Sequence, residues 1–468
     1  MKIYSIPDLY ENISDDFDVF ANNEKIGVYS CRVSAYPLNQ VWPGYQRPIE
    51  QTEKSSFVML GSDDEMVMVV KAKKHFESVT VRPTAKNIKK IIKDETVELT
   101  FPGPGQYSIE FDNKHNVLTV FINPEKEFDE KKQNEIIYFG PGVHQLEDKI
   151  KLENNQTVFI DEGAIVFGGI FAQGKKNISV IGYGILDCSK MQRASDIQSL
   201  SAEEICASKN AGNPIFFANC RNINIEGITI VDAAEWSVRF DGCENINVDN
   251  IKLIGMWRYN ADGCDFCNCL NAIIKNSYLR NFDDCIVVKG LKFNGELPVE
   301  NIIAENCVIW CDWGKALEIG AETCAPYMRN ICFNNCYIIH GTIIMMDIAQ
   351  GDRAKISDVK FEKIYVEYSG EESIPSIQTH VEEKYQNEGK NFVPSLFRIT
   401  AGVTMWSSDS YAGNIKNVSV TNININADAL INPEIRISRS DNTTKIDNIT
   451  IEDVYLNDKE YHAQVIRK

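Results

Sequence analysis

The phrase Asn222-Ile-Asn-Ile-Glu-Gly-Ile-Thr-Ile230 decides the fold, because copies of it recur along the C-terminal two-thirds of the chain. Its pattern is Asn, apolar, any, apolar, any, small or polar, apolar, any, apolar. Strong copies begin at residues 222, 245, 271, 301 and 330, so the steps are 23, 26, 30 and 29 residues, and weaker copies begin at 177, 358, 417 and 448. A nearly constant step of this kind indicates a stacked repeat.

The phrase itself predicts what is stacked. Apolar residues alternate and then shift phase at the Asn or Gly, which is typical of two short strands joined by a bend. In a parallel β-helix each coil relies on its neighbours for backbone partners and a continuous core. Asn tolerates the left-handed backbone region, so we expect it at the bend, bonded to the Asn of the next coil. A β-sandwich or propeller also has short strands, but propeller repeats run to about 40–50 residues.

Composition excludes several classes of partner. The 468 residues are 44% hydrophobic and 24% charged, as in a folded soluble protein, and a solenoid of this length is feasible because it grows in one dimension. The net charge of −18 argues against nucleic acid or an anionic membrane as the main partner. Residues 1–8 lack the apolar run of a secretory signal and no later stretch reaches transmembrane length, so the expected location is the cytoplasm.

Thirteen of the fourteen cysteines lie in the repeat region, often at strand positions such as Cys307 and Cys336. We expect most of them to be free thiols that pack in the core as small apolar groups. Cys264, Cys267 and Cys269 are an alternative zinc site, but none of the six histidines lies nearby in sequence to complete it. No metal and no other cofactor is therefore predicted.

The first third of the chain has a different sequence pattern. Period-two segments without the Asn phrase, such as Met66-Val-Met-Val-Val-Lys71, are separated by turn signals such as Pro102-Gly103-Pro104-Gly105. They predict a small antiparallel β-sandwich. The charged stretch 124–135 is the best linker, so we divide the chain into a sandwich domain (1–130) and a β-helix catalytic domain (131–468). A face of the sandwich could mediate homo-oligomer formation, which the sequence does not decide.

Three carboxylates suggest the chemistry. Asp262 lies in Asn260-Ala-Asp-Gly-Cys-Asp265, and Asp283 and Asp284 open Asp-Asp-Cys-Ile-Val-Val-Lys289. Asp262 and Asp283 are 21 residues apart, which predicts adjacent coils on one face. Such crowding raises at least one pKa, and an acid beside a base about 6.5–9.5 Å away suits inverting glycoside hydrolysis. Asp283 and Asp284 can share a cleft only at a strand end or bend, because neighbours on a strand point to opposite faces.

These two motifs resemble the Asn-Thr-Asp-Gly-type and Asp-Asp-Cys motifs of the polygalacturonase-like glycoside hydrolases, family 28. The resemblance covers roughly residues 136–460, and a preceding sandwich resembles the related dextranase and isopullulanase family. It implies a right-handed parallel β-helix and hydrolysis with inversion. Carried over by position, it implies that Asp284 is the general acid, while Asp262 and Asp283 hold and activate the water.

The chain departs from the family pattern in two places. Lys315 in Trp313-Gly-Lys-Ala-Leu-Glu-Ile-Gly320 stands where the family has the histidine of Gly-His-Gly. The pectin-cleaving members carry Arg-Ile-Lys for a uronate, and here Ile344-Met-Met-Asp-Ile-Ala-Gln350 offers Asp347, which would repel a carboxylate and could bond sugar hydroxyls. Arg353, Lys289 and Arg258 could compensate, but a neutral or atypical sugar is the simpler interpretation.

Further substrate-binding candidates flank these motifs. Aromatic faces are common platforms for sugar rings, and Glu318 would be costly to bury without a cation. The full set of predicted substrate-binding residues is Lys315, Lys289, Trp257, Arg258, Tyr259, Trp313, Glu318, Glu322, Asp347 and Arg353. Trp236 and Arg239, one coil earlier, could widen the site.

Three functions remain open from the sequence. The first is an inverting glycosidase acting on an oligo- or polysaccharide. The second is a lyase or epimerase on the same scaffold, in which the acids bind calcium and Lys315 or Lys289 removes a proton. The third is a carbohydrate-binding β-helix without catalysis. The acids in their two motifs favour the hydrolase.

Overall fold

The computed structural model describes most of the chain and is built from β-strands. The described residues are 1–35, 49–128, 135–194, 211–342, 344–369, 395–427, 431–440, 443–463 and 465–467, together with the short strands β37 (Ser376–Ile377) and β38 (Gln386–Asn387). Their helical turns are short 3₁₀ segments such as η2 (Thr84–Lys86) and η5 (Lys292–Asn294). Within this part of the chain, no helix is long and apolar enough to span a membrane.

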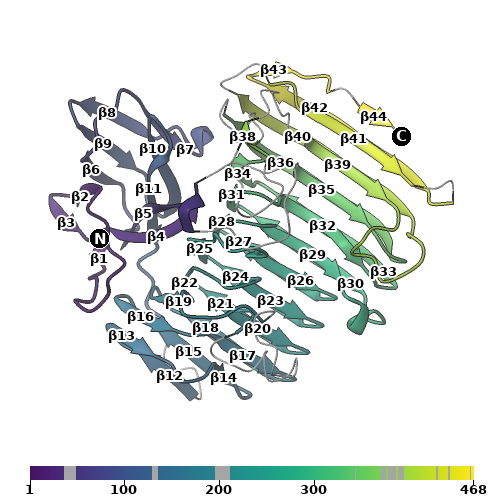
Figure 1. The fold of residues 1–468 in the computed structure, drawn as a ribbon, viewed down its shortest axis with the longest axis horizontal. Coiled ribbons are helices and arrows are strands. Elements are labelled where there is room, and N and C mark those ends of the chain that lie inside the picture. Colours follow the sequence, from purple (N-terminus) through teal and green to yellow (C-terminus); the bar gives the residue numbers. More distant parts are fainter. Residues whose placement is uncertain are drawn as a thin grey trace.

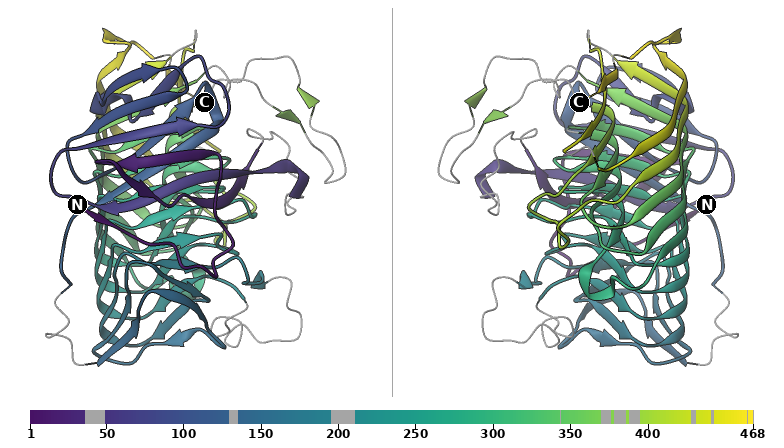
Figure 2. Two further views of the ribbon diagram at one scale, coloured as in Figure 1. Left: turned by 90° about the vertical axis from the view of Figure 1, so that its left-hand side faces the viewer. Right: turned by 90° about the vertical axis from the view of Figure 1, so that its right-hand side faces the viewer.

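The repeat region forms the predicted parallel β-helix, a column of stacked coils (Figures 1 and 2). One sheet of eleven parallel strands runs along it: β14 (Ile150–Lys151), β17 (Ile170–Gln173), β20 (Ile215–Ala218), β23 (Val238–Asp241), β26 (Cys264–Cys267), β29 (Ile286–Gly290), β32 (Lys315–Thr323), β35 (Ile344–Gln350), β39 (Ser395–Ala401), β41 (Glu434–Arg439) and β44 (Val465–Arg467). This sheet forms the floor of the site described below.

The other twenty strands of the column form a bent sheet, in which each strand pairs in parallel with the equivalent strand of the next coil, apart from the last. Its first run is β12 (Glu135–Phe139), β15 (Gln156–Ile160), β18 (Lys176–Ile181), β21 (Arg221–Glu226), β24 (Glu244–Asp249), β27 (Leu270–Lys275), β30 (Val299–Glu305), β33 (Tyr327–Asn334), β36 (Lys355–Tyr368), β40 (Ile415–Ala427) and β42 (Ile446–Leu456). Its second run is β13 (Gly142–Gln145), β16 (Ala164–Phe167), β19 (Ile185–Asp187), β22 (Thr229–Val231), β25 (Lys252–Ile254), β28 (Tyr278–Asn281), β31 (Val308–Cys311) and β34 (Tyr337–Gly341). The antiparallel β43 (Lys459–Glu460) closes the end.

The repeated Asn forms the expected ladder. Asn222, Asn245 and Asn271 have φ values of 56°, 58° and 54°, in the left-handed region. The side-chain amide of Asn245 donates to Asn222 at 3.0 Å, and the chain of bonds continues through Asn271 to Asn301 at 3.3 and 2.8 Å. A neutral amide can both donate and accept, which lets one residue type satisfy every step of the stack.

The column is filled by the alternate apolar residues of each phrase, such as Ile223, Ile225 and Ile246. The thirteen described cysteines are free, and all but one are buried. Cys264 and Cys269, predicted as core thiols with a zinc site as the alternative, belong to this apolar core.

The N-terminal third packs two sheets face to face, as predicted. A six-stranded sheet contains β1 (Lys2–Ile3), β4 (Tyr29–Ser34), β5 (Thr52–Gly61), β7 (Val79–Arg82), β10 (Gly105–Phe111) and β11 (Asn113–Asn123), and the five-stranded sheet contains β2 (Phe17–Ala21), β3 (Glu24–Ile26), β6 (Met66–Ala72), β8 (Lys89–Lys93) and β9 (Thr96–Phe101). All pairings are antiparallel except that of β5 with β11. The predicted domain boundary at residue 130 lies outside the described residues, between β11 and β12.

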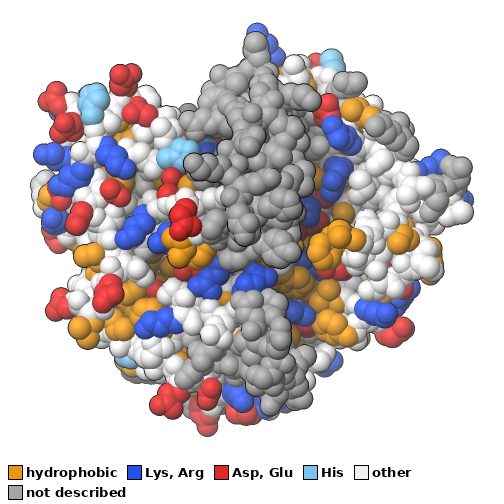
Figure 3. All heavy atoms as spheres, viewed as in Figure 1, with side chains coloured by type: hydrophobic (Ala, Val, Ile, Leu, Met, Phe, Trp, Pro, Cys, Tyr) orange, Lys and Arg blue, Asp and Glu red, His pale blue; other side chains and the backbone are white. Residues whose placement is uncertain are grey.

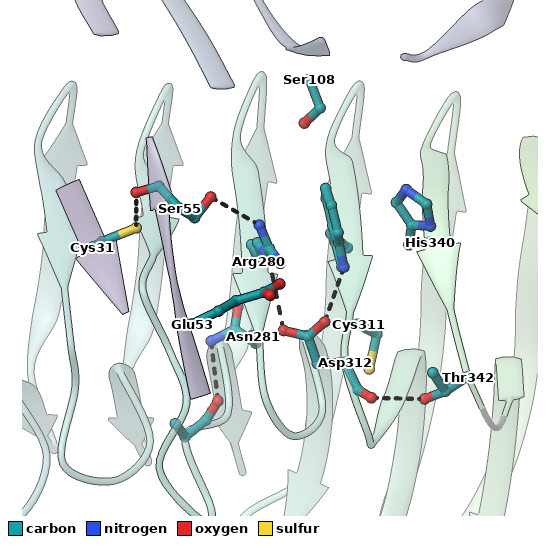
Figure 4. Close-up of polar contacts among 12 residues, drawn as sticks. Cys31, Glu53, Ser55, Ser108, Arg280, Asn281, Cys311, Asp312, His340 and Thr342 are labelled. Carbon is teal, nitrogen blue, oxygen red and sulfur yellow. Dashed lines mark hydrogen bonds and ion pairs between the residues drawn. The ribbon is translucent and has the colours of Figure 1, made fainter. Parts of the chain in front are cut away.

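The six-stranded sheet lies against the side of the column through an apolar layer that includes Tyr29, Phe57, Tyr278 and Trp310 (Figure 2). Charged groups are buried in the same interface. Arg280 from β28 points at Ser55 of β5, 3.2 Å away, and at Asp312, while the guanidinium stacks on the Trp310 ring at 3.7 Å (Figure 4). The interface therefore has a specific register.

Candidate active site

The acids converge because three motifs occupy one ladder of the eleven-stranded sheet. Cys264 of β26 pairs with Ile286 of β29, which pairs with Leu317 of β32. Two residues before each of these lie Asp262, Asp284 and Lys315. Backbone bonds fix this stacking, since Gly263 N–H donates to the Asp284 carbonyl at 2.8 Å and Cys285 N–H donates to the Lys315 carbonyl at 2.9 Å. Asp284 is therefore the ladder neighbour of Asp262, and Asp283 lies beside it on the same coil, adjacent to the coil of Asp262.

Asp283 and Asp284 sit in the bend between β28 and β29, as their shared cleft requires. The bend is tight: Asp284 N–H donates to the Asp283 carboxylate at 3.0 Å, and the Asn281 amide donates to the Ala261 carbonyl at 3.1 Å. The next coil crosses so closely that a Cβ on Gly314 would lie 2.5 Å from both the backbone N and Oδ1 of Asp284. Only glycine fits there, which explains the Trp-Gly-Lys sequence.

Lys289 is the buried cation that pairs with Asp262 and Asp265. Its Nζ lies 3.2 Å from Asp262 Oδ2 and 3.3 Å from Asp265 Oδ1, and 3.8 Å from the centroid of the Trp236 ring. The Lys289 side chain is 5% exposed, so the ammonium is held by these partners with little help from solvent. Asp265 was quoted in its motif but not predicted as a site residue.

Lys315 pairs with Asp284. Its backbone N–H donates to Asp284 Oδ1 at 2.8 Å, and its Nζ lies 3.2 Å from both Asp284 Oδ1 and Glu318 Oε1. Glu318 has no exposed surface, and the cation that it contacts is Lys315. The residue that replaces the family histidine is thus bonded to Asp284.

Crowding spreads the pKa values of these carboxyls. Burial, reinforced by the charge of Asp284, raises the pKa of Asp283 to about 7, and burial also raises that of Asp265 to about 7. Burial opposes ionisation of Asp284 too, but Lys315 and a hydrogen bond with Glu318 outweigh it and lower the pKa of Asp284 to about 2. The pKa values of neighbouring carboxyls in this site therefore differ widely, from about 2 for Asp284 to about 7 for Asp283.

A cleft of about 150 Å³ opens above the acids. Of the predicted residues it is lined by Asp262, Asp283, Asp284, Lys289, Lys315, Tyr259, Trp313 and Glu322. Trp236, Asn260, Ala321 and Trp406 complete the lining. Four aromatic side chains thus surround the carboxylates, as a sugar platform requires. On the face in Figure 3, acidic, basic and hydrophobic side chains are interspersed.

The remaining predicted residues lie outside this lining. Arg258 bonds Asp232 at 2.9 Å and the Met191 carbonyl at 2.7 Å, and Trp257 precedes it, beside the same Asp232. Asp347 has no exposed surface, and both of its oxygens accept from Arg398, at 2.9 and 2.5 Å, so Asp347 is engaged by protein rather than open to sugar hydroxyls.

Arg353 also lies outside the lining, bonded to Asp409 at 2.9 Å and to the Gly295 carbonyl at 2.9 Å. Arg398 and Trp406 had no motif that could identify them. A strand arginine beneath the cleft and a tryptophan on a loop are recognisable only once the coils are stacked.

Comparison with known proteins shows the family of this chain. Residues 145–405 match the model of glycosyl hydrolases family 28, more than half of the chain, and the chain belongs to this family. Dex49A from Penicillium minioluteum has a similar structure, with a TM-score of 0.61 and 16% identity over 93% of this chain and 90% of that one. An exopolygalacturonase from Thermotoga maritima has a TM-score of 0.48 and 16% identity over 72% of this chain and 85% of that one. No curated protein sequence matches.

Proposed function

We propose that this glycoside hydrolase cleaves the O-glycosidic bond of a neutral oligosaccharide with inversion at the anomeric carbon. The observation that supports a neutral substrate is that both lysines lining the cleft are paired with carboxylates. Lys289 is held by Asp262 and Asp265, Lys315 by Asp284 and Glu318, and, beneath the cleft, Arg398 by Asp347. A uronate that bound either lysine would have to displace one of these carboxylates, leaving it buried without its partner, which is costly.

The proposed reaction uses the three acids of the cleft. Asp284 protonates the leaving oxygen as the bond from it to the anomeric carbon breaks. A water held by Asp262 and Asp283 attacks the opposite side of that carbon and gives its proton to one of these carboxylates. The aromatic side chains of Trp236, Tyr259, Trp313 and Trp406 would hold the sugar rings.

The same electrostatics argue against a lyase or epimerase. A lysine that removes a proton must be neutral at the operating pH. Burial opposes the charge of Lys315, but Asp284 and Glu318 outweigh it and hold the pKa of Lys315 well above its usual range. Asp262 and Asp265 do the same for Lys289. Both lysines are therefore suited to fixing carboxylates rather than to acting as bases.

The test is product analysis on paired substrates. Purified protein is incubated with neutral and uronate oligosaccharides of matched length, and proton NMR follows the first anomer released. Asp284→Asn is the active-site variant, and Glu300→Gln, which removes a surface carboxyl paired with Arg329, is the control.

The expected result is a neutral reducing sugar of inverted configuration, produced by the control at the wild-type rate and by Asp284→Asn at least about 10²-fold more slowly. Release from uronate substrates alone would refute the neutral-sugar proposal. A retained configuration would refute inversion, and an unsaturated product would favour the lyase.

A further inference from the structure

The proposed reaction needs a proton on Asp284, yet Asp284 is the carboxyl best placed to lose it. Its Oδ1 accepts the Lys315 backbone N–H at 2.8 Å, and the Lys315 ammonium lies 3.2 Å from the same oxygen. Both contacts stabilise the ionised form. The acid of this chain therefore requires a nearby source of a proton, and this question rests on the proposed function.

Counting charges shows that protons are retained around the cleft. Five carboxyls, each at most 6% exposed, surround two ammonium groups: Asp262, Asp265, Asp283, Asp284 and Glu318, with Lys289 and Lys315. Three buried negative charges in excess would be very costly. The cheaper arrangement is that some of these carboxyls stay neutral.

In the described part of the chain, Glu318, like Asp265, lacks hydrogen-bond donors. It has no exposed surface, and neither oxygen receives a conventional hydrogen bond within the described residues. Its ionic contact is Lys315 at 3.2 Å, and Lys315 is shared with Asp284. The Lys315 Nζ lies 3.2 Å from Asp284 and 3.2 Å from Glu318, so two buried carboxyls share one cation. One of the two negative charges is therefore in excess, and a proton on one carboxyl removes it.

The groups that face Glu318 from neighbouring strands favour the same arrangement. On the side of β29 its pairing partner is the apolar Val287, and on the side of β35 it is Asp347. Asp347 is neutralised by Arg398, so it neither donates to Glu318 nor leaves it a free cation. Buried beside these groups and Asp284, the pKa of Glu318 lies well above its usual range.

We infer that Asp284 and Glu318 form a carboxyl pair that holds one proton, with Glu318 as the store from which Asp284 is protonated. The proton starts on Glu318, hydrogen-bonded to the Asp284 carboxylate. It shifts to Asp284 as Asp284 transfers it to the leaving oxygen. The pair is left with two negative charges against Lys315, and a proton from solvent restores it after product release. Glu318 touches Asp284 rather than the substrate, so it is a positioning residue.

Infrared difference spectroscopy tests the resting proton without any substrate. Glu318→Gln keeps the size of the side chain but has no carboxyl, so at pH 7 it should lose one protonated-carboxyl C=O band relative to wild type. Asp284→Asn keeps Glu318, so the band should remain at a shifted frequency. Glu300→Gln supplies the reference spectrum for a surface carboxyl. A Glu318→Gln spectrum that keeps all such bands would overturn the inference.

The second test measures the pH dependence of kcat/KM, with the substrate that the product analysis identifies. In Glu318→Gln the proton must be held by Asp284 alone, so the basic limb of the pH profile of kcat/KM should move to lower pH by about one unit or more, and kcat at pH 7 should fall about 10- to 100-fold. Glu318→Asp should recover part of the rate and of the limb. If folded Glu318→Gln kept the basic limb of the pH profile at the wild-type pH, Glu318 would not be the proton source of Asp284. A purely structural defect would lower the rate at every pH without moving that limb.

The two arms separate the possible failures. A lost infrared band with no hydrolysis of any sugar would support the shared proton and reject the proposed function. Hydrolysis with neither the lost band nor the shifted limb would support the proposed function and reject the shared proton.

Discussion

Arg353 and Asp409 form an ion pair at 2.9 Å that joins the turn after β35 to the loop after β39. Asp352 supports the same loop, since its carboxylate accepts the backbone N–H groups of Ser408 and Asp409 at 2.6 and 2.7 Å. The loop carries Trp406, whose side chain is 54% exposed at the cleft. Arg353, predicted to bind substrate, thus lies where it can position a residue that does.

Replacing Arg353 with Ala should therefore weaken substrate binding more than chemistry. We expect KM to rise several-fold with kcat nearly unchanged, because a ring that contacts ground state and transition state alike contributes uniform binding. Trp406→Ala should give a similar change, and the double variant should lose little more than either single variant. Arg329→Ala, which breaks a surface pair with Glu300, is the control. Fully additive losses would show that Arg353 acts independently of Trp406.

The fold was predictable because its signal is periodic. The Asn phrase encodes a left-handed bend and two strands in nine residues, and repetition shows that the bends stack. The spacing of 21 residues placed Asp262 and Asp283 on adjacent coils, and both line the cleft. It could not show that Asp284 is the ladder neighbour of Asp262, because that depends on the backbone bonds between the coils.

The chemistry of the site was predictable only where a motif carried it. Asp262, Asp283, Asp284 and Lys315 were identified from motifs, and the structure brings them together in one cleft. Charged residues such as Arg258 and Arg353 look equally available in a sequence, and only three-dimensional contacts show that protein groups already hold them. Trp406 is contributed by a loop without any pattern, so no sequence signal could place it.

Replacing Lys289 with Met should destabilise the fold at neutral pH. Asp262 and Asp265 would lose their cation while remaining buried, which costs about 3–5 kcal/mol of unfolding free energy. Burial already holds the pKa of both carboxyls above the unfolded value although Lys289 opposes it, and without Lys289 the rise is larger. The penalty should then be smallest at low pH and grow as the pH rises toward 7.

Urea unfolding at pH 5 and pH 7 measures this difference. Lys275→Met, which breaks the exposed pair with Asp249, is the control and should change stability by about 0.5 kcal/mol or less. An equal loss at both pH values would mean that Lys289 matters for packing alone.

Glu110 should make the stability of the interface between the sandwich and the β-helix sensitive to acid. It is buried between Arg82 of its own sheet and His340 of the column. Burial opposes its ionisation, but His340 and Arg82 prevail and lower its pKa from 4.5 to about 2. A depressed carboxyl stabilises the fold above its unfolded pKa, and the contribution, about 3 kcal/mol, is lost as pH falls from about 4.5 toward 2.

Glu110→Gln should therefore lose about that much stability at pH 7 and show a weaker decline between pH 5 and pH 3 than wild type. Urea unfolding across this range checks both, and Glu53→Gln at the exposed His115 pair is the control. Parallel pH curves for wild type and Glu110→Gln would contradict the assignment.

Gly314 should be the residue through which the stacking of coils controls catalysis. A methyl group there would meet Asp284 N and Oδ1 at 2.5 Å, so Gly314→Ala must displace the acid or the coil that carries Lys315. We expect a stability loss of about 1–3 kcal/mol from overpacking and, because a small misplacement can cost 10²-fold, a fall in kcat of about that size. Gly174→Ala is a suitable comparison, since φ is +66° there but no atom lies within 4 Å, so it should lose stability without losing activity. Measuring kcat and urea unfolding for both variants separates the two effects, and a Gly314→Ala enzyme of wild-type kcat would show that Asp284 need not hold the position seen here.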